Sequence, residues 1–161
     1  KMQPRWAQFN PLTALEDCLR VLRDASRVQF EAPSDLVWHS DLLLCQTIMS
    51  NLLDNALKYS PPDSLVFARL GCDVSRNKWY LQVQNQIGAA GIPAPERIFE
   101  KYYRAPGAQA QRGTGLGLWL TKALVEQLGG ILEYQVQDHP ALAAQQTTAF
   151  QEIIFTVWFP V

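Results

Sequence analysis

The segment 41–60 most constrains the fold, because its pattern predicts one long helix with two distinct faces. One face is apolar at helical spacing and must be buried: Cys45, Ile48, Met49, Leu52, Leu53 and Ala56. Asn51, Asn55 and Lys58 follow at i, i+4 and i+7 and share a second face. Asn is a poor helix-interior residue because its amide competes for backbone hydrogen bonds. The second face therefore indicates either a solvated stripe or a site for a metal ion carrying phosphates.

A glycine-rich turn leads into a second apolar helical pattern further along the chain. It consists of Gly113, Thr114, Gly115, Leu116, Gly117 and Leu118. Glycines let the backbone approach phosphates closely, and amides at a helix N-terminus bind anions. The turn lacks the Lys of a P-loop, and no strong strand precedes it as a dinucleotide fingerprint requires. Taken alone, such a turn is weak evidence for phosphate binding, and an ordinary flexible loop is the better explanation.

Between these two motifs lies a short amphipathic segment, 98–104, with the sequence Ile-Phe-Glu-Lys-Tyr-Tyr-Arg. In this order, the three motifs resemble the catalytic ATP-binding domain of sensor histidine kinases. That family belongs to a superfamily shared with DNA gyrase, mismatch-repair ATPases and an ATP-dependent chaperone. Residues 51–59 resemble its N box, 98–104 its F box and 113–118 its second glycine box, while 85–93 resemble a modified first glycine box. The likeness covers nearly the whole chain.

The periodicities predict an α/β fold. They indicate a helix beginning at Asn10 and Pro11, strands at 27–31 and 36–38, a hairpin of 64–72 with 78–86, and a helix ending at Gly129 and Gly130. Strands at 131–136 and 152–159 follow, joined by the polar stretch 137–150. The resemblance implies a two-layer sandwich, in which a mixed β-sheet of about five strands is covered on one face by three helices. With 161 residues, 48% of them hydrophobic, a single domain over 1–161 is expected.

The resemblance also implies roles for single residues. Asn55 matches the Mg²⁺ ligand, with Asn51 beside it, and Lys58 and Arg104 would neutralise phosphate oxygens. Hydrolysing relatives carry a water-activating Glu where this chain has Asn51, so the chain is expected to donate phosphate rather than to hydrolyse ATP. Tyr59 is expected beside the sugar or phosphates, or else in the core, and Arg112 is either a lid cation or a solvated charge. Further ATP contacts are expected from Gly88, Gly91, Ile92, Tyr103 and the turn Gly113, Thr114, Gly115, Leu116, Gly117 and Leu118.

The first glycine box of the family normally begins with an Asp that accepts a hydrogen bond from the adenine amino group. No Asp occurs between residues 73 and 138. A gapless alignment on Gly91 places Ile87 at that position, whereas strand alternation favours Asn85, which continues the face of Trp79, Leu81 and Val83. An Asn amide offers both a donor and an acceptor, so either purine fits unless a neighbouring group fixes the amide.

The charge and hydrophobicity of the chain limit the kinds of partner that are expected. The net charge of −1 gives no argument for nucleic acid or an anionic membrane, and no apolar run is long enough to span a bilayer. Cys18, Cys45 and Cys72 are expected to be buried free thiols. The resemblance implies ATP and Mg²⁺, a phosphoacceptor His on a separate dimerisation domain, a response regulator, and a cytoplasmic domain of a membrane-anchored bacterial parent. His39 and His139 lack the sequence context of that acceptor.

Two alternatives of other kinds remain. A degenerate module would bind nucleotide weakly and act through protein contacts, which the altered first glycine box favours. An anti-sigma-factor serine kinase of the same superfamily is disfavoured by the motif at 98–104.

Overall fold

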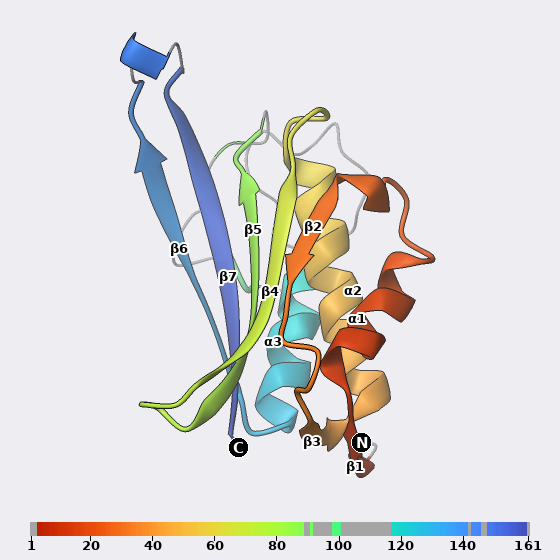
Figure 1. The fold of residues 1–161 in the computed structure, drawn as a ribbon. Helices are drawn as coiled ribbons and strands as arrows, with labels where there is room; N and C mark the ends of the chain where they lie inside the picture. The colour runs from red at the N-terminus through yellow and green to blue at the C-terminus, as the bar shows by residue number, and fades with distance from the viewer. Residues whose placement is uncertain are drawn as a thin grey trace.

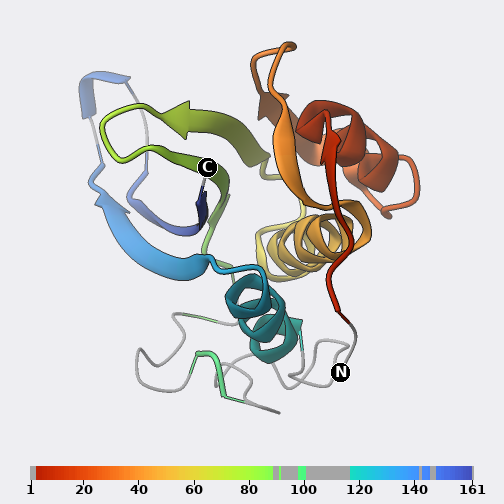
Figure 2. The same ribbon diagram turned by 90° about the horizontal axis from the view of Figure 1, so that it is seen from below.

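The central feature of the computed structural model is a five-stranded sheet in the order β2-β4-β5-β7-β6. The structure describes residues 3–88, 91, 98–100, 117–141, 143–145 and 148–160. The strands of this sheet are β2 (Val28–Glu31), β4 (Val66–Asp73), β5 (Lys78–Gln86), β6 (Ile131–His139) and β7 (Phe150–Pro160). Three helices cover one of its faces (Figures 1 and 2): α1 (Pro11–Leu19), α2 (Leu42–Tyr59) and α3 (Gly117–Gln127). The predicted two-layer α/β sandwich is therefore confirmed.

The strand register explains which side chains face the helices. β2 runs parallel to β4, and the other neighbouring pairs are antiparallel. Val83 lies opposite Ala68 on one side and Phe155 on the other, and all three are buried. Because side chains alternate along a strand, Ala68 and Leu70 of β4 and Leu81 and Val83 of β5 join this apolar layer. The core thus fills the space between the sheet and the three helices.

Both N-terminal helices begin at the caps that their sequences indicate. The side-chain oxygen of Asn10 accepts a hydrogen bond from the Leu12 amide at 2.8 Å, and Pro11 occupies the first turn of α1. The side chain of Asp41 accepts from the Leu44 amide at 3.0 Å and caps α2. The apolar face predicted for α2 is buried along its whole length.

The strands predicted at 27–31 and 36–38 are found at Val28–Glu31 (β2) and Trp38–Asp41 (β3), so the second is shifted along the chain, and they belong to different sheets. β2 joins the main sheet, whereas β3 (Trp38–Asp41) pairs with β1 (Trp6–Phe9) in a separate two-stranded sheet. The connection between β6 and β7 is shorter than the predicted stretch 137–150, because β6 continues to His139 and β7 begins at Phe150. These two residues are paired, and their rings stack at 4.5 Å. Aromatic stacking and backbone pairing therefore extend this hairpin beyond the predicted ends.

The prediction of three buried thiols is wrong for one of them. Cys18 and Cys45 are buried, whereas Cys72 is exposed. Cys72 has the strand parity of the buried Ala68 and Leu70, but it lies next to the β4–β5 turn, which projects away from the helices (Figure 1). Burial raises the pKa of the Cys45 thiol to about 11, despite a hydrogen bond to Ser40.

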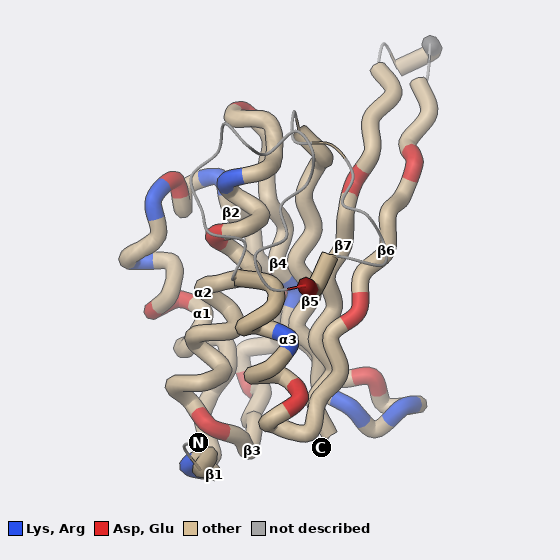
Figure 3. The backbone as a smooth tube through the Cα atoms, turned by 180° about the vertical axis from the view of Figure 1, so that it is seen from behind, with Lys and Arg blue, Asp and Glu red and all other residues tan. Residues whose placement is uncertain are grey.

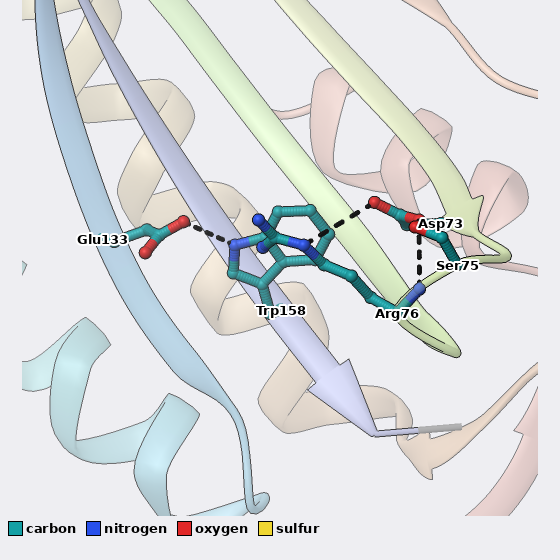
Figure 4. Close-up of polar contacts among 5 residues, drawn as sticks. All are labelled: Asp73, Ser75, Arg76, Glu133 and Trp158. Carbon is teal, nitrogen blue, oxygen red and sulfur yellow. Dashed lines mark hydrogen bonds and ion pairs between the residues drawn. The ribbon is translucent and has the colours of Figure 1, made fainter.

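A polar cluster ties the β4–β5 turn to the neighbouring strands (Figure 4). The Asp73 carboxylate accepts from the Ser75 hydroxyl at 2.7 Å and from the Arg76 amide at 3.2 Å. The Arg76 guanidinium lies 4.7 Å from the centre of the Trp158 ring, whose indole N–H donates to Glu133 at 2.7 Å. The turn of one hairpin is therefore attached to β7 and, through it, to β6.

Candidate functional site

The second face of α2 carries the polar residues that the sequence singles out. Asn51 and Asn55 are half-buried in its C-terminal half, and Lys58 is exposed in its last turn. The side-chain nitrogen of Asn51 is buried and has no hydrogen-bond partner among the described residues. Leaving such an amide unpaired costs about 1–3 kcal/mol. Because rotation of the amide exchanges its nitrogen and oxygen, this position suits a ligand that binds either group.

Lys58 is engaged with a neighbour on its own helix. Its ammonium lies 3.0 Å from the Asp54 carboxylate, one turn earlier, and both side chains are about half exposed. Exposed i,i+4 ion pairs of this kind contribute only about 0.3–0.5 kcal/mol. An anionic ligand can therefore take over the ammonium at little cost. Asp54 was not predicted to be near the site, although its spacing from Lys58 would have indicated the pair.

The end of α2 contacts the first glycine-rich segment. The Gly88 amide donates to the Tyr59 carbonyl at 3.2 Å, and a Cβ atom at residue 88 would lie only 2.6 Å from that oxygen. The Gly91 amide in turn donates to the Gly88 carbonyl at 3.1 Å, and Gly91 has a φ of 79°. Residue 88 therefore requires glycine for close approach, and residue 91 requires it for its left-handed backbone. These contacts bring the end of α2 and the first glycine-rich segment side by side.

Asn85 lies on the helix-facing side of β5, as strand alternation predicts. It is only 3% exposed and lies opposite Val66 and Ile153. Its amide nitrogen donates to the Gln86 carbonyl at 2.7 Å. That bond fixes the amide orientation and leaves the side-chain oxygen to accept a hydrogen bond from a ligand.

α3 packs beside α2 and begins at Gly117 (Figures 1 and 2). The buried Thr121 hydroxyl donates to the Gly117 carbonyl at 2.6 Å, and Leu118 is half-buried against the core. The remaining predicted site residues lie outside the described part of the chain. They are Ile92, Tyr103, Arg104, Arg112, Gly113, Thr114, Gly115 and Leu116.

Potential metal ligands and charged side chains are spread over the described part of the chain. No group of three or more His, Cys, Asp or Glu side chains among them is arranged to hold a metal ion. The side-chain oxygens of Asn51 and Asn55 on α2 are the kind of neutral ligand that Mg²⁺ accepts, because this ion keeps few protein ligands. Acidic and basic residues are interspersed over both layers that the structure describes (Figure 3). None of the described helices has the length and apolarity to cross a lipid bilayer.

Sequence reasoning missed Arg27, which precedes β2 in a short 3₁₀ turn (Ala25–Arg27). Its guanidinium donates to backbone carbonyls at the end of α2 and in the loop that follows. One feature of the sequence indicated that such a donor is needed. Pro61 and Pro62 follow α2, and prolines have no N–H with which to cap the carbonyls of the preceding helix.

Comparison with known proteins agrees with this geometry. Residues 40–161 match the family described as histidine kinase-, DNA gyrase B- and HSP90-like ATPase. The chain is 32% identical over 120 residues to the sensor histidine kinase HprS of Escherichia coli, covering 74% of this chain and 26% of that protein. It is 42% identical over 91 residues to the signal transduction histidine-protein kinase/phosphatase MprB of Mycobacterium tuberculosis, covering 55% of this chain and 17% of that protein.

A solved structure of a mycobacterial sensor histidine kinase MprB superposes on the chain with a TM-score of 0.69 and 28% identity. The match covers 98% of this chain and 100% of that structure. The chain thus spans about a quarter or less of the two curated relatives, but nearly all of a structure from the same kind of kinase. The family match therefore includes α2 and the first glycine-rich segment, which contains Gly88 and Gly91. The chain therefore belongs to the histidine kinase-, DNA gyrase B- and HSP90-like ATPase family.

Proposed function

We propose that this domain binds Mg²⁺-ATP and donates the γ-phosphate to a histidine on a separate dimerisation domain. The observation that carries the proposal is the buried side-chain nitrogen of Asn51 on the polar face of α2, which has no hydrogen-bond partner among the described residues. The end of the same helix packs against Gly88. The names of the relatives, which are sensor histidine kinases, support the same reaction class.

In this proposal, the two asparagines of α2 bind the metal ion and two basic residues bind the phosphates. The side-chain oxygens of Asn55 and Asn51 would bind Mg²⁺. Lys58 would leave its exposed pair with Asp54 for a phosphate oxygen, and Arg104 would supply a second positive charge. Bound ATP supplies the phosphoryl group. Because Asn51 is a weak proton acceptor, it would not activate water, so the phosphate is kept for the histidine acceptor.

Asn85 would read the base. Its oxygen, left unused by the bond between its nitrogen and Gln86, accepts from an amino group such as that of adenine. Guanine presents a carbonyl at the same position and would face an acceptor. We therefore assign the domain a preference for ATP over GTP.

The proposal also names partners and a location. A response regulator would receive the phosphate from the histidine, as two-component relatives of this kind imply. The domain would act in the cytoplasm, where ATP is available, within a membrane-anchored bacterial parent.

Calorimetric titration with a non-hydrolysable ATP analogue, with and without Mg²⁺, tests the proposal. Wild type should bind in a Mg²⁺-dependent manner, and Asn55→Ala should lose the metal dependence while keeping its melting temperature. Gln135→Ala is the matched control, because it removes an exposed amide from the edge strand β6. Equal binding by wild type and Asn55→Ala would remove Asn55 from the site.

A degenerate module acting through protein contacts is the second candidate, favoured by the missing Asp of the first glycine box. Joining a helical dimerisation domain upstream distinguishes the two. Transfer of labelled γ-phosphate to its histidine supports the kinase. A folded fusion protein that binds no nucleotide and transfers no phosphate supports the degenerate module.

A further inference from the structure

Helix α2 ends where the usual backbone cap cannot form. Its C-cap, Ser60, has an extended backbone, and Pro61 and Pro62 follow directly. The last four carbonyls of a helix lack intrahelical donors and are commonly satisfied by N–H groups of the residues just beyond it. Prolines have no N–H, so the carbonyls at this end need donors from other parts of the chain.

Two distant segments supply those donors. The Leu57 carbonyl accepts from Nη1 of Arg27 at 3.1 Å, across 30 positions of sequence. The Tyr59 carbonyl accepts from the Gly88 amide at 3.2 Å. The helix end that carries Lys58 is therefore held from both sides, by the segment before β2 and by the segment after β5.

Arg27 also fixes the loop that follows the helix. Its Nη2 donates to the Ser60 hydroxyl at 2.6 Å and to the Pro61 carbonyl at 2.8 Å, and its Nε donates to the Ser64 carbonyl at 2.9 Å. All three guanidinium nitrogens are thus used, and the positive charge lies at the negative end of the helix dipole. A lysine has a single charged nitrogen and cannot reproduce this planar set of contacts.

We propose that Arg27 is a positioning residue for the nucleotide site. Arg27 holds the last turn of α2 so that Lys58 and Tyr59 face the ligand and the Tyr59 carbonyl stays in contact with Gly88. It acts without touching the nucleotide, because its donors are committed to the helix end and to the loop. This inference rests on the proposed function.

The test compares nucleotide affinity and local protection in the same proteins. Calorimetry with Mg²⁺ and a non-hydrolysable ATP analogue is performed on wild type, Arg27→Met and Arg27→Lys. Arg69→Met is the control, because Arg69 is an exposed arginine on β4 that pairs with Glu31 at 3.6 Å on the sheet. Hydrogen exchange of the Gly88 amide, measured without nucleotide, reports whether the helix end has moved. Thermal melting shows whether each variant is folded.

We expect Arg27→Met to raise the Kd for the analogue about tenfold, within the usual range of coupling between a ligand and a distant group. Exchange of the Gly88 amide should accelerate, Arg27→Lys should fall between Arg27→Met and wild type, and Arg69→Met should bind like wild type. If Arg27→Met does not fold, Ser60→Ala replaces it, since it removes only the acceptor at 2.6 Å, and it should weaken binding by about threefold.

Wild-type affinity in folded Arg27→Met, or in Ser60→Ala where that variant is used, overturns the inference and leaves the proposed function intact. An equal loss of affinity in Arg69→Met also overturns it, since any lost arginine would then have the same effect. Absence of nucleotide binding by wild type overturns the proposed function itself, and this inference with it.

Discussion

Replacing Gly88 with Ala tests whether the first glycine-rich segment must contact the end of α2. The new Cβ would lie 2.6 Å from the Tyr59 carbonyl oxygen, 3.2 Å from the Ser60 carbonyl carbon and 3.3 Å from the Pro61 nitrogen. All three are backbone atoms, so no flexible side chain can give way. Relief requires the strand end or the helix end to move, which also breaks the hydrogen bond from Gly88 to Tyr59.

The cost follows from these two effects. Overpacking a tight site costs about 1–3 kcal/mol, and a lost backbone hydrogen bond costs about 0.5–1.5 kcal/mol. We therefore expect Gly88→Ala to lower the free energy of unfolding by about 2–4 kcal/mol, a large part of the roughly 5–15 kcal/mol typical of a domain. Affinity for Mg²⁺-ATP should fall as well, because the same movement displaces Tyr59.

Urea denaturation followed by tryptophan fluorescence measures the change. Gly117→Ala is the matched control for stability, because its Cβ position has no heavy atom of another described segment within 4 Å and its backbone has no positive φ. At the start of α3, alanine is also the better helix former, by up to about 1 kcal/mol. Gly117→Ala should therefore be neutral or stabilising. If the two variants have equal stability, the close contact of Gly88 is not a constraint on the fold.

Three further predictions concern the reactivity of the cysteines, the pKa of Asp73 and the selection of ATP over GTP. A thiol reagent at neutral pH should modify the exposed Cys72 quickly. Cys45 should react only after unfolding, because burial raises its pKa to about 11. If the fast phase of modification is unchanged in Cys72→Ser, this prediction is wrong. The Ser75 hydroxyl, aided by the Arg76 amide, lowers the pKa of Asp73, so the carboxylate stabilises the turn above its unfolded pKa and this contribution disappears as the pH falls through the folded value. NMR titration should show the pKa of Asp73 rising in Ser75→Ala, and an unchanged value would refute the cause. Competition between ATP and GTP should show a preference for ATP that Asn85→Ala removes, and an unaltered preference would assign base reading to another residue.

Local patterns were sufficient to predict the helices and the side of the sheet on which Asn85 lies. The bounds of α2 agree with the prediction because its apolar spacing, its Asp41 cap and the following prolines are all encoded within the segment. Alternation along β5 placed Asn85 with Leu81 and Val83, and the structure confirms that face. These signals depend only on the geometry of a single element.

Features that depend on distant segments were not predictable from the sequence. β2 and β3 have four residues each, too few to carry a pattern that selects a partner, so their membership in different sheets was missed. Cys72 shares the strand parity of the buried Ala68 and Leu70, but it lies next to the β4–β5 turn and is exposed. Arg27 is indistinguishable in sequence from a solvated arginine, and only the folded chain brings it to the end of α2. The role of Arg104 stays a prediction.

The aromatic side chains that join the two sheets give the fold an optical signature. Trp38 of β3 is fully buried and stacks on Trp79 of β5, with ring centres 6.0 Å apart and planes 18° from parallel, and Phe159 packs against it at 5.4 Å. Two indoles held this closely in a fixed orientation couple their electronic transitions and produce a paired circular dichroism band. Its intensity depends on the docking of the small sheet onto the large one. Detachment of the N-terminal strands would therefore be visible in the spectrum even while α2 and the central sheet remain folded.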